Sequence, residues 1–377
     1  MQLAEFDPAA FLRDHWQKQP LLIRNPWAAW SNPLDPDELA GLACEDGIES
    51  RLVRRTRKDW KLEHGPFAAK RFAKLGKHPW TLLVQAVDHV VPAVAALVAP
   101  FRFVPNWRID DVMVSYASDG GGVGPHFDRY DVFLIQGLGR RRWRVGGRCD
   151  AATPLLPHDD LKLLADFEAT DEWVLEPGDI LYVPPGFAHE GVAVGDDCMT
   201  YSVGFRAPSR AELIAGWCDD VLSRLGDDDR YADPDLMMQA NPGEIAPAAL
   251  ARLHALVTEA LADAPAFARW FGEHGTAPKY DIEPHAEDAT PADDVRDRID
   301  AGAALVRNPA SRFAFVAGEP LLLFVDGECR ACGGATAPFA EALCAADRLI
   351  PEPGLAASAP ALALIAALID RGSIAFD

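Results

Sequence analysis

Apolar and polar residues alternate with a period of two between positions 101 and 206, which predicts a strand-rich domain. The alternation is clearest in residues 111–116, where every second side chain would face the same side of a sheet. Gly137-Leu138-Gly139 separates two apolar runs and predicts a hairpin. We expect strands at residues 111–116, 131–136, 140–145, 180–183 and 199–205. Short antiparallel strands with Gly- and Pro-rich turns predict a double-stranded β-helix, the jelly-roll barrel of the cupins.

A period of three to four residues replaces this alternation after Pro208. Apolar positions recur at helical spacing from Arg210 to about Phe271, and residues 248–261 repeat the pattern. The apolar stripes on these predicted helices are wider than packing against one barrel would require. We therefore expect a dimerisation bundle, with a helical layer over the barrel as the alternative.

The two ends of the chain complete the predicted order of elements. The first ninety residues are expected to be mixed helix and loop, with a helix that begins at Asp7-Pro8 and a short buried strand at residues 21–23. Residues 278–292 carry charge and proline and predict a linker. Beyond this linker we expect helices at 293–304, 337–346 and 360–371, a hairpin of 313–316 with 322–325, and a last strand at 374–376. That order predicts a winged-helix-like domain.

The predicted fold class is therefore α+β with three parts. Residues 1–207 would form the barrel together with an N-terminal helical region, residues 208–276 the dimerisation region, and residues 277–377 the winged-helix-like domain. A homodimer through residues 208–276 follows from this division as an expectation.

Charge and composition narrow the classes of partner. The 377 residues carry a net charge of −21, which argues against non-specific binding to DNA or to an anionic membrane. The last domain is itself acidic and cannot neutralise DNA phosphates, so we expect it to be a protein-interaction or packing module. No apolar stretch could span a bilayer, and the first residues do not resemble a secretory signal. Seven scattered cysteines without a disulfide framework favour the reducing cytoplasm.

Two local patterns each have a purely structural and a functional explanation. Residues 51–77 contain ten Lys or Arg against two acids; a solvated face is favoured, and a docking surface for RNA or a phosphorylated assembly is the alternative. Cys329 and Cys332 form a single C-x-x-C motif, whereas zinc usually requires four ligands. A hairpin turn that contains two thiols is therefore the favoured interpretation.

His126, Asp128 and His189 are the strongest candidates for chemistry. His126 and Asp128 are two residues apart, so on a strand both side chains would face the same side. His189 follows the turn-rich segment Pro184-Pro185-Gly186. Two imidazoles and one carboxylate can occupy three adjacent corners of an octahedron, which is the facial triad of non-haem Fe(II) oxygenases.

Five segments around these residues resemble the JmjC ribosomal oxygenases, especially their bacterial arginine hydroxylases. They are residues 11–24 (FLRDHWQKQPLLIR), 122–133 (GVGPHFDRYDVF), 136–145 (QGLGRRRWRV), 176–191 (EPGDILYVPPGFAHEG) and 201–208 (YSVGFRAP). The likeness extends over nearly the whole chain. It implies a JmjC barrel, a helical dimerisation segment and a C-terminal winged helix. It also implies Fe(II) on His126, Asp128 and His189, with 2-oxoglutarate and O2 as cosubstrates.

The resemblance assigns three residues to the cosubstrate. Arg141 matches the residue that pairs with the distal carboxylate of 2-oxoglutarate, and a guanidinium suits a carboxylate. Strand parity would point Arg141 and Trp143 into the barrel. Arg140, Arg142 and Arg144 would then point outward. Ser115 matches a position that can hydrogen-bond the same carboxylate; a core serine bonded to backbone is the alternative. Thr200 lies near the expected cosubstrate site, where the family has an asparagine. The segment 192–197 is one residue longer here than in the family.

Six further residues are expected to contact the substrate. Asp111, Met113 and Ser115 share one parity, so the first two can face the same cavity. The resemblance implies that Asp111 and Ser202 hold a substrate guanidinium, while Met113, Tyr130, Phe205 and Arg206 line the path to it. A salt bridge to Arg108 or a turn cap is the alternative for Asp111.

The sequence therefore predicts a 2-oxoglutarate-dependent dioxygenase that hydroxylates C-3 of an arginine in the sixteenth protein of the large ribosomal subunit. Another JmjC reaction, N-methyl-lysine demethylation or RNA hydroxylation, is the first alternative. A non-catalytic cupin that binds the ribosome is the second. A zinc hydrolase fits the inward arginine less well than a site for a dicarboxylate does.

Overall fold

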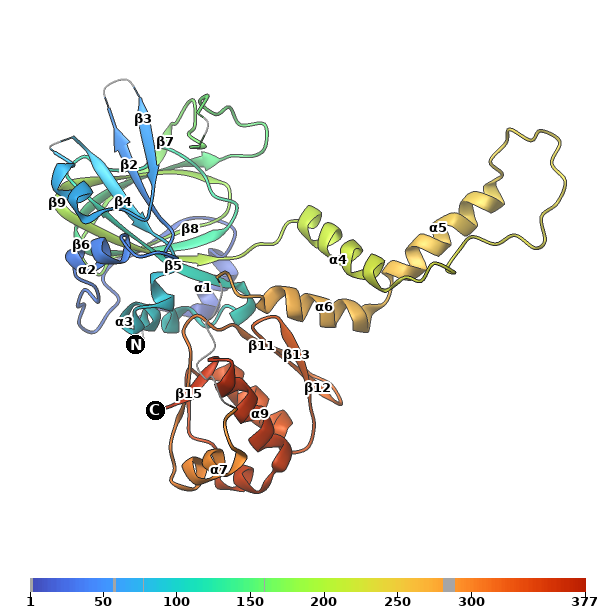
Figure 1. Ribbon diagram of the computed structural model, residues 1–377. Helices are drawn as coiled ribbons and strands as arrows, with labels where there is room; N and C mark the ends of the chain where they lie inside the picture. The colour runs from blue at the N-terminus through green and yellow to red at the C-terminus, as the bar shows by residue number, and fades with distance from the viewer. Residues whose placement is uncertain (1–2, 57–58, 77, 159, 281–288) are drawn as a thin grey trace. The chain divides into compact units, whose positions relative to one another are not determined.

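The computed structural model describes residues 3–56, 59–76, 78–158, 160–280 and 289–377 and divides the chain into two compact units (Figure 1). Unit 1 is Met1–Ala207, and unit 2 is Pro208–Asp377. No helix among the described residues is long and apolar enough to cross a membrane.

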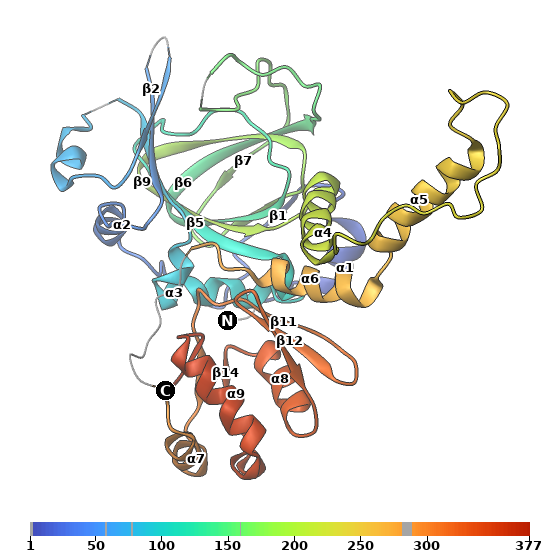
Figure 2. The same cartoon turned by 45° about the vertical axis from the view of Figure 1, so that its right-hand side comes forward.

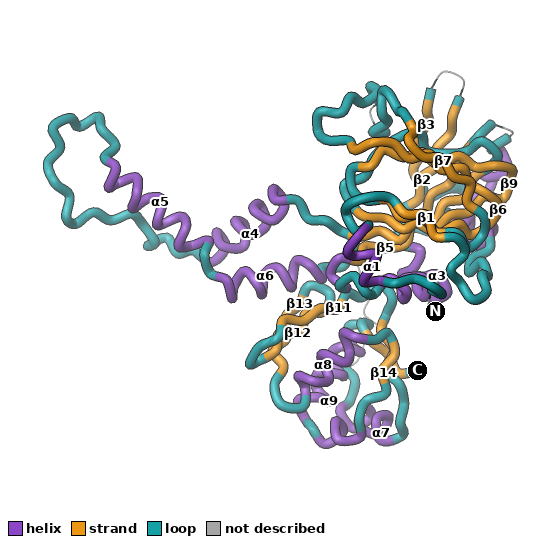
Figure 3. The backbone as a smooth tube through the Cα atoms, turned by 180° about the vertical axis from the view of Figure 1, so that it is seen from behind, coloured by secondary structure: helices purple, strands orange, loops and turns teal. Residues whose placement is uncertain are grey.

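Unit 1 is built on one antiparallel sheet that curls into a barrel, seen from behind in Figure 3. Its strands are β1 (Leu21–Ile23), β2 (Ser50–Arg55), β3 (Trp60–His64), β4 (Trp80–Val84), β5 (Ile109–Ala117), β6 (Asp131–Arg148), β7 (Ala169–Leu175), β8 (Ile180–Val183) and β9 (Phe187–Phe205). The order is β1-β8-β6-β9-β5-β4-β2-β3, and β7 also pairs with β6. Three of these strands, β2, β3 and β4, fall in the N-terminal region that the sequence assigned to helix and loop.

The predicted hairpin around Gly137-Leu138-Gly139 is wrong, because β6 continues through it as one strand of 18 residues. The register of β6 against β9 shifts between Gln136 and Leu138 and again between Leu138 and Arg140. Gly139 has a φ of +59°, which a residue with a side chain rarely adopts. The glycines therefore form bulges inside a strand that pairs with β8 in its first half and with β7 in its second half.

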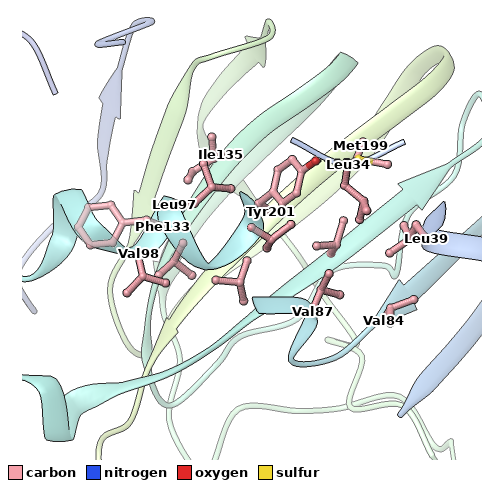
Figure 4. Close-up of a cluster of buried hydrophobic side chains, with 14 of the residues drawn as sticks. Leu34, Leu39, Val84, Val87, Leu97, Val98, Phe133, Ile135, Met199 and Tyr201 are labelled. Atoms are coloured by element: carbon pink, nitrogen blue, oxygen red, sulfur yellow. Dashed lines mark hydrogen bonds between the residues drawn. The ribbon is translucent and has the colours of Figure 1, made fainter. Parts of the chain in front are cut away.

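Short helices cover one face of the sheet. They are α1 (Pro8–Asp14), α2 (Pro36–Leu42), α3 (Pro92–Ala95) and the 3-10 helices η1 (Ala69–Lys74), η2 (Val87–His89), η3 (Ala96–Phe101) and η4 (Asn106–Arg108). The Asp7 carboxylate caps α1 as the sequence predicts, since it accepts hydrogen bonds from the Ala9 and Ala10 N–H groups. The core between helices and sheet includes Phe133 and Ile135 from β6 and Tyr201 from β9 (Figure 4).

Unit 2 begins with three helices and ends with a small mixed domain (Figure 2). The helices are α4 (Arg210–Arg224), α5 (Pro247–Leu261), α6 (Ala264–Thr276), α7 (Ala292–Asp300), α8 (Thr336–Ala345), α9 (Ala359–Asp370) and the 3-10 helix η5 (Pro353–Ala357). The strands are β10 (Leu305–Arg307), β11 (Phe313–Val316), β12 (Leu321–Val325), β13 (Glu328–Cys332), β14 (Arg348–Leu349) and β15 (Ile374–Phe376). The expected linker 278–292 falls partly outside the described residues.

The C-x-x-C motif lies on β13 and not in a turn. Cys329 pairs with Phe324 and Cys332 with Leu321 across the β12–β13 ladder. Residues three apart on a strand face opposite sides of the sheet, so the two thiols do not converge. Both cysteines are free thiols.

The basic segment at residues 51–77 follows β2, β3 and η1 at one edge of the unit 1 sheet. Glu63 pairs with Arg54 at 2.8 Å and with Arg71 at 2.7 Å, so part of the positive charge is neutralised internally. Arg71 lowers the pKa of Glu63, which keeps this carboxylate ionised. Lysines at an exposed sheet edge also discourage pairing with other chains, which agrees with the favoured interpretation of a solvated face.

Candidate active site

His126 and His189 face each other across a single β-bridge. The His126 N–H donates to the His189 carbonyl at 3.0 Å, and the His189 N–H donates to the His126 carbonyl at 2.8 Å. His189 lies on β9, whereas His126 and Asp128 precede β6 in a loop. The predicted strand through His126 and Asp128 is therefore wrong, and the bridge to β9 places the pair beside His189.

Backbone carbonyls fix both imidazoles in the form that a metal requires. His126 Nδ1 lies 2.8 Å from the Gly124 carbonyl oxygen, and His189 Nδ1 lies 2.9 Å from the Phe187 carbonyl oxygen. A carbonyl oxygen only accepts hydrogen bonds, so each Nδ1 carries the proton and each Nε2 keeps a free lone pair. The same arrangement on both histidines is typical of metal ligands.

The ligand atoms of the three residues converge. Asp128 Oδ2 lies 3.5 Å from His189 Nε2 and 3.9 Å from His126 Nε2. In the described part of the chain, these three residues form the group whose ligand atoms all lie within 4.8 Å of one another. Burial, together with the adjacent His126, lowers the pKa of His189 to about 4, so its ring is neutral at pH 7. The donor set therefore fits a divalent transition metal with open coordination positions.

Arg141 points into the barrel, as strand parity predicts. Only 4% of its surface is exposed, and it lies between Arg140 and Arg142, which are both exposed. Its Nε donates to Cys198 Sγ at 3.3 Å. Within the described part of the chain its Nη2 is buried and has no hydrogen-bond partner. A buried guanidinium with an unused donor fits the carboxylate of a dicarboxylic acid.

Ser115 and Thr200 lie directly opposite each other on β5 and β9. Both are buried, and the Ser115 hydroxyl lies 3.5 Å from the Thr200 carbonyl oxygen. The Thr200 hydroxyl donates to Gln136 Oε1 at 3.2 Å. Gln136 and Cys198 were not among the residues expected at the site; Gln136 belongs to a segment that the sequence assigned to a hairpin strand.

Asp111 is buried, with 3% of its surface exposed, and its carboxylate is held by a glutamine. Gln85 Nε2 donates to both Asp111 oxygens at 2.9 Å, and Gln85 Oε1 accepts from Arg51 at 3.2 Å. Arg108 donates to Asp131 at 3.1 Å. No pattern along the chain marks Gln85 or Arg51, because only the pairing of β2 with β4 and of β4 with β5 brings them to Asp111.

The other expected substrate residues divide between two faces of the sheet. Met113 and Ser202 lie opposite each other on β5 and β9, on the face that also carries Ser115. Tyr130 is 43% exposed, and burial of its hydroxyl together with the nearby Asp128 raises the pKa of this phenol. Arg206 donates to the Trp107 carbonyl at 3.0 Å.

Phe205 does not fit the role that the sequence gave it. It is fully buried on the opposite face of β9 from Ser202, in the core with Phe133 and Trp16. A residue at an odd number of positions from Ser202 must face away from it on a regular strand. Phe205 therefore packs against the helices and does not line the barrel interior.

Comparison with known proteins agrees with this geometry. The family model of the JmjC domain matches residues 96–213, and that of the ROXA-like winged helix matches residues 259–375. The chain is 42% identical over 371 residues to the Ribosomal protein uL16 3-hydroxylase of Escherichia coli, covering 97% of each chain. It is 34% identical to the Probable ribosomal oxygenase of Haemophilus influenzae, covering 85% of this chain and 81% of that one.

Solved structures extend the likeness to the whole fold. The X-ray structure of E. coli ycfD superposes with a TM-score of 0.92 at 40% identity and covers all of both chains. A structure of YcfD, a ribosomal oxygenase from E. coli, in complex with cobalt and 2-oxoglutarate gives a TM-score of 0.89 at 40% identity, covering 100% of this chain and 99% of that chain.

Proposed function

This chain belongs to the JmjC ribosomal oxygenases, and on that premise we propose that it hydroxylates C-3 of an arginine side chain in ribosomal protein uL16. The observation that carries the proposed substrate is the buried Asp111 carboxylate, 3% exposed and held by Gln85. A negatively charged side chain facing a cavity attracts an arginine side chain, which supplies both a positive charge and hydrogen-bond donors. The E. coli relative is named as a uL16 3-hydroxylase, which agrees with this choice.

The protein is a 2-oxoglutarate-dependent oxygenase that uses Fe(II) and O2. When bound, the iron and 2-oxoglutarate supply the oxidising chemistry, with succinate and CO2 as coproducts. We infer that His126, Asp128 and His189 would hold the metal through the two Nε2 atoms and the carboxylate. Arg141 would bind the distal carboxylate of 2-oxoglutarate through the buried Nη2 donor. Ser115 and Thr200, which lie opposite each other on β5 and β9, would contact the same cosubstrate.

The chain's own contribution is to orient the substrate and to exclude water. We infer that Asp111 and Ser202 bind the guanidinium, while Met113 lies between them on the same face. Tyr130, which is partly exposed and close to Asp128 in the chain, would border the entrance, and Arg206 would line the path. When the guanidinium is held in place, one side-chain carbon is oriented toward the metal. Hydroxylation would therefore occur at that carbon and not at its neighbours.

Mass spectrometry of a uL16 peptide tests the substrate. The peptide is incubated with Fe(II)-loaded protein, 2-oxoglutarate and O2, and a gain of one oxygen on an arginine is expected. Asp111→Asn retains the shape of the side chain and removes the charge, so it should lower turnover by at least about tenfold, as expected for a lost charge-assisted contact.

Each alternative product has its own signature. Release of formaldehyde from a methyl-lysine peptide, or a gain of oxygen in RNA, would replace the proposed reaction with the other JmjC chemistry. No turnover by the iron-loaded protein on peptide or RNA would favour a ribosome-binding module.

We also propose that the protein is a cytoplasmic homodimer that pairs through residues 208–276, ahead of the winged-helix domain. The proposed substrate is a ribosomal protein, and this supports a location in the cytoplasm. The exposed apolar side chains of α4 and α5, and of the segment between them, support the interface. They are Ile214, Leu222, Leu225, Leu236, Met237, Met238, Ile245, Leu250, Leu253 and Val257. Apolar side chains gathered on a surface in this way mark sites of association.

A further inference from the structure

A buried polar network lies beside the Nε group of Arg141. Arg141 Nε donates to Cys198 Sγ at 3.3 Å, and Gln136 Nε2 lies 3.6 Å from the same sulfur. Cys198 and Gln136 are both fully buried. A guanidinium presents its donors in one rigid plane, so a partner on Nε fixes the direction in which the remaining N–H groups point.

We propose that Cys198, held in place by Gln136, is a positioning residue that aims the Arg141 guanidinium at the distal carboxylate of 2-oxoglutarate. The inference rests on the role of Arg141 proposed above and adds the residues that set its direction. Cys198 touches neither the metal nor the cosubstrate in this scheme. It acts only through Arg141.

Gln136 is anchored at both ends of its amide. Its Nε2 donates to the Leu138 carbonyl at 2.7 Å, and its Oε1 accepts from the Thr200 hydroxyl at 3.2 Å. The Leu138 carbonyl is available because the two bulges of β6 interrupt the ladder on either side of this residue. The bulges therefore build the network that holds Cys198 beside Arg141.

A thiol suits this place better than a stronger acceptor. A carboxylate beside Nε would form an ion pair with Arg141 and compete with the cosubstrate for its charge. Sulfur accepts hydrogen bonds weakly and carries no charge in its thiol form. Cys198 thus orients the guanidinium while leaving its positive charge for the ligand.

Two ligands that differ in one carboxylate test the proposal. 2-Oxoglutarate and 2-oxobutanoate share the oxo-acid end that binds a metal, but only the first has a distal carboxylate for Arg141. Titration calorimetry on the full-length Co(II)-loaded chain measures both affinities without turnover. Cys198→Ala is the main variant, and Cys198→Ser restores an uncharged acceptor. Cys149→Ala is the matched control, because Cys149 is a free thiol away from this network.

The expected result is selective. Cys198→Ala should weaken 2-oxoglutarate binding by about five- to tenfold, as expected for the loss of one hydrogen bond of ordinary strength, and leave 2-oxobutanoate binding within about twofold. Cys198→Ser should recover most of the loss, and the control should match the unaltered chain. Thermal unfolding of each ligand-free variant confirms that the fold is retained.

Two outcomes would overturn the proposal. Unchanged 2-oxoglutarate affinity in Cys198→Ala would show that Arg141 needs no support from the thiol. Equal weakening of both ligands would show a general disturbance of the site. If the unaltered chain bound both ligands equally, the fault would lie in the assignment of Arg141 on which this inference rests.

Discussion

Single residues decide the chemistry of this site through their backbone contacts. Each imidazole of the triad donates its Nδ1 proton to a carbonyl two residues earlier in the chain, at Gly124 and at Phe187. The tautomer is therefore set locally, before any metal binds. Burial keeps His189 neutral at pH 7 because it lowers the pKa of the ring to about 4.

Replacement of one ligand should remove the metal and leave the fold intact. In His126→Ala we expect Fe(II) affinity to fall by at least about tenfold and turnover to be abolished, because even outer-shell changes cost that much. Metal content after dialysis and far-ultraviolet circular dichroism check the two expectations. His64→Ala, an exposed histidine on β3, is the control. Full activity in His126→Ala would refute the triad.

The buried Asp88 should make stability depend on pH. Burial raises its pKa to about 7, with smaller contributions from the charges of Asp111 and Asp110. The folded chain keeps this proton up to about pH 7, whereas the unfolded chain loses it near the ordinary value of 3.8. The folded state binds more protons in that window, so the free energy of unfolding falls as pH rises through it.

Asp88→Asn removes this titration while keeping an oxygen that can accept the Val112 N–H, which now donates at 2.8 Å. The free energy of unfolding of the unaltered chain should fall relative to the variant from pH 4 to pH 7, by at most about 1.4 kcal/mol per pH unit. Urea unfolding at a series of pH values measures the difference. Parallel curves for the two chains would contradict the assignment.

At the scale of elements, β6 links the metal site to the cosubstrate site. It pairs with β8 and β7 in turn and with β9 along its length, and its bulges at Gln136–Arg140 change the direction of the strand. A Cβ on Gly139 would lie 2.6 Å from the Asp197 carbonyl oxygen. The backbone therefore passes too close to β9 for any side chain at this point.

Gly139→Ala should destabilise unit 1 by about 1–3 kcal/mol, because it combines a positive φ with a steric overlap. Gly147→Ala is the matched control on the same strand, since a Cβ there would meet no atom within 4 Å. Thermal unfolding compares the two variants. A Gly139→Ala variant as stable as the control would mean that the bulge can rearrange without cost.

At the scale of the whole molecule, the expected site residues and the largest group of exposed apolar side chains belong to different units. All the expected site residues lie in unit 1, and the exposed apolar side chains of α4 and α5 lie in unit 2. On α5, Leu250, Leu253 and Val257 are spaced three and four residues apart and therefore form one stripe.

The double substitution Leu253→Asp with Val257→Asp should convert the proposed dimer into a monomer, because two charges would be buried at the interface. Sedimentation velocity measures the change. Ala248→Asp, on the opposite side of α5, should leave the dimer intact. An unaltered chain that sediments as a monomer would refute the interface. Fe(II) binding should persist in the variant, because its ligands lie in unit 1.

The sequence by itself determined the residue types and the short-range geometry. The cupin class and the inward side of Arg141 follow from strand parity, because side-chain direction along a strand is fixed by the backbone. The triad was found from its residue types and motif spacing, although His126 and Asp128 lie in a loop and not on a strand. The family resemblance was confirmed by the JmjC and winged-helix matches. The start of α1 was also predicted from its cap, and both ends of α9 were predicted to within one residue.

Tertiary structure decided everything that depends on partners distant in the chain. Gly137 and Gly139, which the sequence assigned to a hairpin turn, form bulges instead, because β9 pairs with β6 on both sides of them. Phe205 went to the core because helices cover that face. Gln85 reaches Asp111 across 26 positions, and Cys198 reaches Arg141 across 57. Local patterns report the period of a segment, whereas these contacts depend on which strands pair and in which register.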